Sequence, residues 1–213
     1  MNKKSKMIFE KLYETYPSLC CCRNEINLAF ELMKSCLEQG GKILVCGNGG
    51  SACDSEHIVG ELMKGFNLRR PLTPAQKARF AELEDGDYIA DRLQGALRAI
   101  SLTSQAGLIT AFANDVDAEL IFAQQVFAYA DECDILIALS TSGNSKNIVL
   151  AAKTAKAVNT KAIAITGSSG GRLDSISDCC IKLPACSPYE VQEFTLPVYH
   201  SLCAALELEF FES

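Results

Sequence analysis

The amino-acid sequence predicts an α/β fold in which five parallel strands form one sheet with helices on both faces. Two observations lead to this prediction. Short apolar runs alternate with longer amphipathic segments along the 213 residues, which is the pattern of strands joined by crossover helices. Loops rich in glycine or serine follow several of the apolar runs. With 48% hydrophobic residues, the chain can bury the core of one large domain.

The N-terminal segment, residues 1–39, is expected to be helical, because apolar residues recur at helical spacing from Ile8 to Leu37. Pro17 should divide this segment into two helices. Gly40 and Gly41 should end the second helix. A buried strand is then predicted at residues 42–46, where the sequence is a short apolar run.

A glycine-rich loop, Cys46 to Ser51, follows this strand and precedes a helix that should reach about residue 64. Ser51 is expected to cap the helix, with Asp54 as its partner three residues on. The loop lacks the GxGxxG spacing of dinucleotide-binding folds and the GK[ST] ending of a P-loop. The sequence therefore disfavours nucleotide binding there.

The rest of the chain continues the alternation after a helical insertion at residues 67–97. This insertion should contain two short helices, at 75–83 and 88–97. The elements predicted after it are a strand at 99–102, a helix to 112, a loop at 114–115, a helix at 118–130, a strand at 134–139, a helix to 158, strands at 161–166 and 179–183, and a helix at 190–210. Parallel strands place their loops at one edge of the sheet, where ligands bind.

Composition excludes several classes of partner. The net charge of −6 argues against broad contact with nucleic-acid phosphates. No apolar run reaches the roughly 18 to 20 residues of a membrane span, and the N-terminus lacks a secretory apolar region. Eleven cysteines occur without a CxxC pair, so we expect a cytoplasmic protein that uses cysteine as a small apolar residue. Redox sensing by the run at 20–22 is the less favoured alternative.

Two constellations suggest chemistry. Four hydroxyls, those of Ser140, Thr141, Ser142 and Ser145, lie within six residues between a predicted strand and helix. A turn needs only one hydroxyl, whereas a phosphate needs several converging donors and gains from a helix N-terminus. The sequence therefore favours a phosphate site over a serine-rich turn.

The second constellation contains the only two histidines of the chain. His57 and Glu61 lie on one helix face, where they could chelate a metal, pair as base and acid, or form a surface pair. Gln192 and His200 are about 12 Å and about 80° apart on an ideal helix, so spacing alone does not bring them together. Pro197 lies between them and could bend the helix. A packed core histidine is the alternative for His200.

At these residues the sequence resembles the SIS (sugar isomerase) family and, more narrowly, its phosphoheptose isomerase branch. The resemblance covers residues 1–213 as a single SIS domain, apart from the insertion at 67–97. The matching residues are those at 46–51, Asp54, His57, Glu61, 113–115, 139–145, 166–167, Gln192, Glu193 and His200.

The resemblance implies a flavodoxin-like, three-layer αβα sandwich assembled as a homotetramer with active sites at subunit interfaces. It implies an enediol isomerase that converts sedoheptulose 7-phosphate to D-glycero-D-manno-heptose 7-phosphate, in the biosynthesis of lipopolysaccharide heptose. Glu61 and His200 would be the acid/base pair, and one Zn²⁺ per subunit would be bound by His57, Glu61, Gln192 and His200. The implied substrate-binding residues are Asn48, Gly49, Gly50, Ser51, Asp115, Ser140, Thr141, Ser142, Ser145 and Gln192.

Two departures from the family pattern concern the sugar. Tyr189 stands where the family has an aspartate, and the insertion at 67–97 is longer than in compact members. An isomerase of a different phosphosugar is therefore one alternative. A non-catalytic SIS module that binds phosphosugars is another, but it would be expected to lack the histidines and Glu61.

Overall fold

The structure, a computed structural model, describes residues 1–211 and contains a sheet of five parallel strands in the order β2-β1-β3-β4-β5. This order is the flavodoxin-like one, so the predicted fold class is confirmed. The strand bounds agree with the predicted runs to within two residues. The strands are β1 (Ile43–Cys46), β2 (Ala99–Ser101), β3 (Ile135–Leu139), β4 (Lys161–Thr166) and β5 (Cys179–Lys182).

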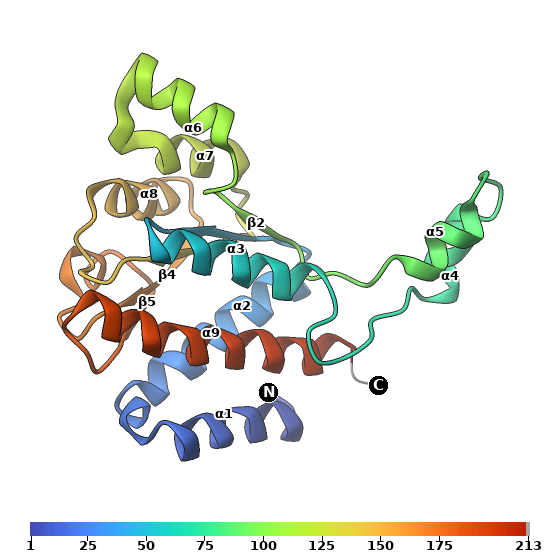
Figure 1. Cartoon of the computed structure of the whole chain (residues 1–213), viewed down its shortest axis with the longest axis horizontal. Coiled ribbons are helices and arrows are strands. Elements are labelled where there is room, and N and C mark those ends of the chain that lie inside the picture. Colours follow the sequence, from blue (N-terminus) through green and yellow to red (C-terminus); the bar gives the residue numbers. More distant parts are fainter. Residues whose placement is uncertain (212–213) are drawn as a thin grey trace.

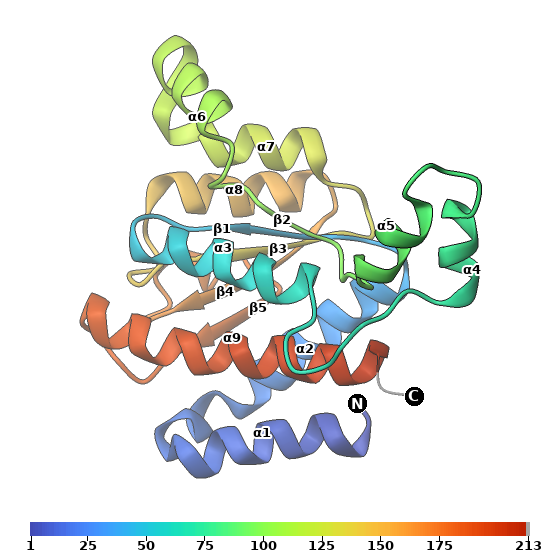
Figure 2. The same cartoon turned by 45° about the vertical axis from the view of Figure 1, so that its right-hand side comes forward.

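Helices cover both faces of the sheet (Figures 1 and 2). One face carries α2 (Arg23–Glu38), α3 (Gly50–Met63) and α9 (Pro188–Phe211), and α1 (Lys3–Thr15) packs against α9 from outside. The opposite face carries α7 (Ile121–Tyr129) and α8 (Lys146–Ala157), with α6 (Ala106–Phe112) beyond them.

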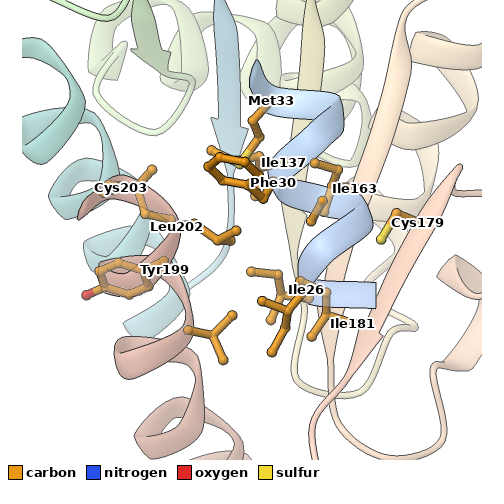
Figure 3. Close-up of a cluster of buried hydrophobic side chains, with 14 of the residues drawn as sticks. Ile26, Phe30, Met33, Ile137, Ile163, Cys179, Ile181, Tyr199, Leu202 and Cys203 are labelled. Carbon is orange, nitrogen blue, oxygen red and sulfur yellow. The ribbon is translucent and has the colours of Figure 1, made fainter. Parts of the chain in front are cut away.

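Two apolar cores result, because successive residues of a strand point to opposite faces. In β1, Ile43 and Val45 join the core beneath α2, α3 and α9, whereas Leu44 and Cys46 join the core beneath α7 and α8. Figure 3 shows the first core, in which α2, the sheet and α9 contribute side chains to one cluster. Burial on both faces explains why the strands are mainly apolar runs, with polar residues confined to their ends.

The N-terminal break is confirmed: α1 ends at Thr15, and Pro17–Cys22 form the 3₁₀ helix η1 before α2. The predicted cap of α3 is wrong. The helix begins at Gly50, after Gly49 in a backbone conformation with φ of 57° that favours glycine, and no side chain caps it. Ser51 is buried inside the first turn, and Asp54 faces α9.

Residues 67–97, the segment predicted to be an insertion, contain two short helices whose bounds differ from the predicted ones. They are α4 (Pro74–Lys77), continued by the 3₁₀ turn η2 (Ala78–Phe80), and α5 (Gly86–Arg92). The left-handed Asp85 separates them, and the extended Leu93 ends α5. This part of the chain, residues 71–94, projects from the body as an arm (Figure 1).

The predicted loop at 114–115 is also wrong, since Ala113–Asp117 form a π-helical turn, η3, and Ala118–Leu120 a 3₁₀ turn, η4. The side chain of Asp117 accepts the amide N–H of Glu119 and so starts the next turn at once. The last helix spans Pro188–Phe211 with Pro197 inside it. Among residues 1–211, no helix combines the length and apolar character that a membrane crossing needs.

Candidate functional site

The serine loop, residues 140–145, connects β3 to the N-terminus of α8. The buried Ser140 donates its hydroxyl to Ser145 Oγ at 3.1 Å, and Ser142 Oγ accepts the amide N–H of Asn144 at 3.1 Å. Ser145 is the N-cap residue of α8, but its side chain does not cap the helix. The hydroxyls therefore gather where the free N–H groups of a 12-residue helix point outward.

The backbone of the serine loop is fixed from outside. Gly143 has a φ of 66°, and a Cβ there would collide with the carbonyl oxygen of Gly170 in the loop after β4. Asn144 Oδ1 accepts the amide N–H of Arg172 at 3.0 Å. A rigid loop is what a preorganised anion site requires.

The glycine loop, residues 47–51, lies beside the serine loop at the same edge of the sheet. The amide of Asn48 exchanges two hydrogen bonds of 2.9 Å with the amide of Asn147 in the first turn of α8. A Cβ on Gly50 would collide with the side-chain amide of Gln192 on α9. The structure thus brings Asn48, Gly50 and Gln192 to the edge that carries the serine loop.

The histidine cluster comprises His57 and Glu61 of α3 together with Tyr199 and His200 of α9. His57 Nε2 lies 3.1 Å from Glu61 Oε1, and the rings of His57 and His200 are 4.9 Å apart. Tyr199 Oη lies 2.9 Å from His57 Nδ1 and donates to Asp54 Oδ1 at 3.4 Å. Two helices whose contacting residues are 142 and 145 positions apart in sequence therefore share one polar cluster.

Burial sets the electrostatics of this cluster. It holds the pKa of His200 below the usual value of 6.5, assisted by the charge of His57 and opposed by that of Glu61. Burial likewise raises the pKa of the Tyr199 phenol, and the nearby Asp54 carboxylate adds to the rise. His200 is therefore a neutral imidazole, and Tyr199 a protonated phenol, at neutral pH.

Two buried atoms of the cluster have no hydrogen-bond partner within residues 1–211: Nε2 of His200 and Oε2 of Glu61. Lys64 Nζ lies 3.5 Å from Oε2, but this lysine side chain is 62% exposed and only forms a loose ion pair. Buried polar atoms normally have hydrogen-bond partners. A bound ligand could therefore supply the partner that each of these two atoms lacks.

The four residues predicted to bind a metal do not all lie together. Helices α3 and α9 run side by side in the same direction, so that Gln192 meets Gly50 and Tyr199 meets His57. Gln192 thus lies about two helical turns from His200. In the part of the chain that the structure describes, no three His, Cys, Asp or Glu side chains form a group that could hold a metal ion.

Asp115 is not joined to the other predicted site residues by any hydrogen bond or ion pair described for residues 1–211. It is exposed on the turn η3, where its carboxylate accepts from the side chain of Asn114 at 2.8 Å.

Sequence reasoning missed three residues around the cluster: Tyr199, Arg70 and Glu207. Arg70 and Glu207 form a fully buried ion pair with Nε and Oε1 2.8 Å apart. Arg70 also donates to the carbonyl oxygens of Glu61 and Leu62, and Glu207 accepts the amide N–H groups of residues 66–68. Glu207 follows the apolar run at 202–206 in α9, and this was a signal for such a pair, because a buried carboxylate needs a partner.

Comparisons with family models, with individual proteins and with solved structures point to the same family. Two SIS domain family models match, one at residues 90–206 and one at residues 21–95. A phosphoheptose isomerase of Akkermansia muciniphila is 31% identical and covers 93% of this chain, which covers 92% of that protein. One of Thiobacillus denitrificans is 38% identical, with 83% and 79% covered. The solved structure of a phosphoheptose isomerase from Francisella tularensis superposes with a TM-score of 0.72 at 31% identity, with 97% and 99% covered.

Proposed function

The chain belongs to the SIS domain family and, within it, to the phosphoheptose isomerases, and from this premise we propose that it converts sedoheptulose 7-phosphate to D-glycero-D-manno-heptose 7-phosphate. The reaction is an aldose–ketose isomerisation, which moves a proton between C1 and C2 through an enediol. The observation that supports the proposal most strongly is the meeting of Glu61, His57 and His200 across α3 and α9.

The serine loop is proposed to hold the substrate phosphate. Ser140, Thr141, Ser142 and Ser145 offer hydroxyls at the N-terminus of α8, where backbone N–H groups and the helix dipole favour an anion. Asn48, Gly49, Gly50, Ser51 and Gln192 are proposed to contact the sugar, because they lie at the same edge of the sheet.

Glu61 is proposed as the base that takes the proton from carbon, and His200 as the acid at the substrate oxygen. A neutral imidazole can donate its N–H to a developing enediolate oxygen, and low solvent access strengthens that hydrogen bond. Glu61 offers a carboxylate oxygen without a hydrogen-bond partner in the described chain. The two roles could be exchanged between the residues.

We propose one zinc ion per subunit, with His57, Glu61, Gln192 and His200 as the predicted ligands. Because Gln192 lies about two helical turns from His200 on α9, its side chain would have to move toward the other three to share the ion. Two imidazoles, a carboxylate and an amide oxygen form a donor set that suits zinc, and the unpartnered atoms of Glu61 and His200 support it. Bound zinc would polarise the substrate carbonyl. Elemental analysis of protein purified without chelator should find the metal, and His57→Ala should lower its occupancy. Equal metal occupancy in the variant would indicate that the metal is bound at another site, and the cysteines would be the first candidate ligands.

A homotetramer with active sites between subunits is also proposed. Its support is that Asp115, a predicted substrate-binding residue, is exposed and has no described hydrogen bond to the rest of the site within residues 1–211, as expected if it contributes to the site of a second copy. Light scattering in solution measures the assembly. We further propose a cytoplasmic location, supported by the eleven cysteines, which are all free thiols.

NMR of the purified protein with sedoheptulose 7-phosphate tests the reaction directly. We expect new resonances of the aldose product and, in D₂O, deuterium at the carbon that exchanges its proton. A panel of other ketose and aldose phosphates separates the alternatives. Turnover of a different phosphosugar would show that the proposed substrate is wrong. Binding of phosphosugars without turnover of any of them would contradict the proposal that the protein is an enzyme.

A further inference from the structure

A cavity of about 500 Å³ lies between α1 and α2. Within the described chain, none of the residues proposed for the isomerase site lines it. It is lined by the buried side chains of Phe9 and Tyr13 and by charged side chains from both helices. Its volume is within the range of about 300 to 1,000 Å³ that is usual for small-molecule sites, so a small molecule fits there by size.

The hydroxyl of Tyr13 is the group in this cavity that most clearly lacks a partner. The Tyr13 side chain is 5% exposed, and its hydroxyl is buried with no hydrogen-bond partner among residues 1–211. Buried hydroxyls normally have partners, because burial removes their hydrogen bonds to water. Burial also raises the pKa of this phenol to about 12. At neutral pH the hydroxyl is therefore a donor without an acceptor.

The residues that line the cavity carry three cationic groups and two carboxylates. The Met1 ammonium lies 3.5 Å from Glu31 Oε1, and Arg23 Nη1 lies 3.2 Å from Glu10 Oε1. Each carboxylate is therefore paired with one cation. The third cation, Lys6, has no ion-pair or hydrogen-bond partner described within residues 1–211. The cavity thus has one positive charge in excess, which favours an anionic ligand.

The positions of these groups indicate the shape of the ligand. Lys6 and Tyr13 lie on the same face of α1, seven residues and therefore about 10 Å apart along the helix. A single ligand that contacts both must be elongated, with its anionic group at the Lys6 end. Asn27 also lines the cavity, and its side chain has no hydrogen bond described in residues 1–211. Its amide offers both donors and acceptors, which suits hydroxyl groups.

We propose that the cavity between α1 and α2 is a second ligand site, which binds an elongated anionic polyol such as a sugar phosphate or a sugar acid. Lys6 pairs with the anionic group, which is the same chemistry for a phosphate and a carboxylate. The phenol of Tyr13 donates to an oxygen at the other end of the ligand, and Asn27 binds hydroxyls between them. Because the two sites share no residue, the inference does not depend on the proposed isomerase function.

The Tyr13 phenol can report binding directly. Protein containing tyrosine labelled with ¹³C at Cζ is titrated with glucose 6-phosphate, with gluconate and with the neutral polyol sorbitol. The chain has six tyrosines, and the signal that is missing in Tyr13→Phe belongs to Tyr13. We expect a saturable shift of this signal with at least one anion, because the hydroxyl gains an acceptor. The anion with the lower Kd identifies phosphate or carboxylate as the preferred group.

Lys6→Met tests the role of the unpaired charge while Tyr13 stays in place as the reporter. The Kd of the anion should rise about 10- to 100-fold, the usual loss for a hydrogen bond to a charged group, and should approach that of sorbitol. Lys153→Met is the matched control, because Lys153 is an exposed lysine of α8 that also has no partner described in residues 1–211. Its Kd should equal that of the wild type.

A Tyr13 signal that neither anion moves at millimolar concentrations would overturn the inference, whether the cavity stays empty or a second copy of the chain covers it. Equal Kd values in Lys6→Met and the wild type would also overturn it, as would sorbitol binding as tightly as the anions. A titration that moves only the signal of Tyr199, assigned with Tyr199→Phe, would place the ligand at the isomerase site and equally reject the cavity. Turnover of sedoheptulose 7-phosphate is measured separately and does not affect these results.

Discussion

The serine loop and the histidine cluster are built in opposite ways. The serine loop takes its hydroxyls from six consecutive residues, and its internal hydrogen bonds join residues at most five apart. The histidine cluster joins α3 to α9, and its hydrogen bonds between these helices connect residues more than 140 apart. The first is a local structure fixed at a helix N-terminus, whereas the second exists only when two distant helices pack in one register.

This difference in construction separates phosphate binding, proposed for the serine loop, from proton transfer, proposed for the histidine cluster. The register of α3 on α9 is held at one end by Gln192 against Gly50 and at the other by the buried pair Arg70–Glu207. Arg70 also donates a hydrogen bond to the carbonyl oxygen of Glu61 in the last turn of α3. Changes to the packing of these helices should therefore alter the reaction, whereas changes in the serine loop should alter the affinity for phosphate.

The largest expected effect is on turnover. Glu61→Gln and His200→Gln each remove a proton-transfer group while keeping a similar volume, so kcat should fall by about 10² to 10⁴. Steady-state kinetics with the heptose phosphate measure this, and circular dichroism checks that the fold is retained. Near-normal kcat in either variant would contradict the assignment.

The second expected effect tests the contact between α3 and α9. Arg70→Met leaves the buried carboxylate of Glu207 without its cation, which typically costs about 3 to 5 kcal/mol of unfolding free energy. Urea unfolding measures this loss. Lys77→Met is the matched control, because it breaks an exposed ion pair with Asp91 in the arm and should change stability little. Equal stability of the two variants would show that the buried pair does not hold α3 on α9.

A smaller effect is expected in the serine loop. Ser142→Ala and Ser145→Ala each remove a donor to the phosphate, far from the reacting carbons, so KM should rise with little change in kcat. A hydrogen bond to a charged group contributes roughly 1 to 3 kcal/mol, which sets the size of the rise. An unchanged KM in both variants would remove the loop from phosphate binding.

The smallest expected effect is a change of folding stability with pH. Because the pKa of His200 lies below 6.5 in the folded chain, the unfolded chain takes up the proton first as pH falls. The metal-free protein should therefore be fully stabilised above pH 6.5 and lose stability as pH drops through this value toward the folded-state pKa. Urea midpoints of chelator-treated wild type and His200→Gln should diverge in this window. Parallel curves would contradict the buried, neutral imidazole.

The sequence by itself determined the order of strands and helices, because apolar periodicity is a local property. It also located the serine loop, whose residues are consecutive. It misplaced features that depend on single backbone or side-chain choices. Ser51 does not cap α3, since Gly49 has a positive φ of 57° and takes the N-cap position two residues earlier. The expected loop at 114–115 remains helical.

Only the tertiary structure decided how α3 and α9 meet. Helical spacing kept Gln192 and His200 apart, and the structure agrees, since they contact α3 at different levels. No local pattern could show that Tyr199 lies between His57 and Asp54, or that Arg70 and Glu207 are paired. Each contact joins residues more than 130 apart. Such contacts arise because both helices must bury their apolar faces on the same side of one sheet.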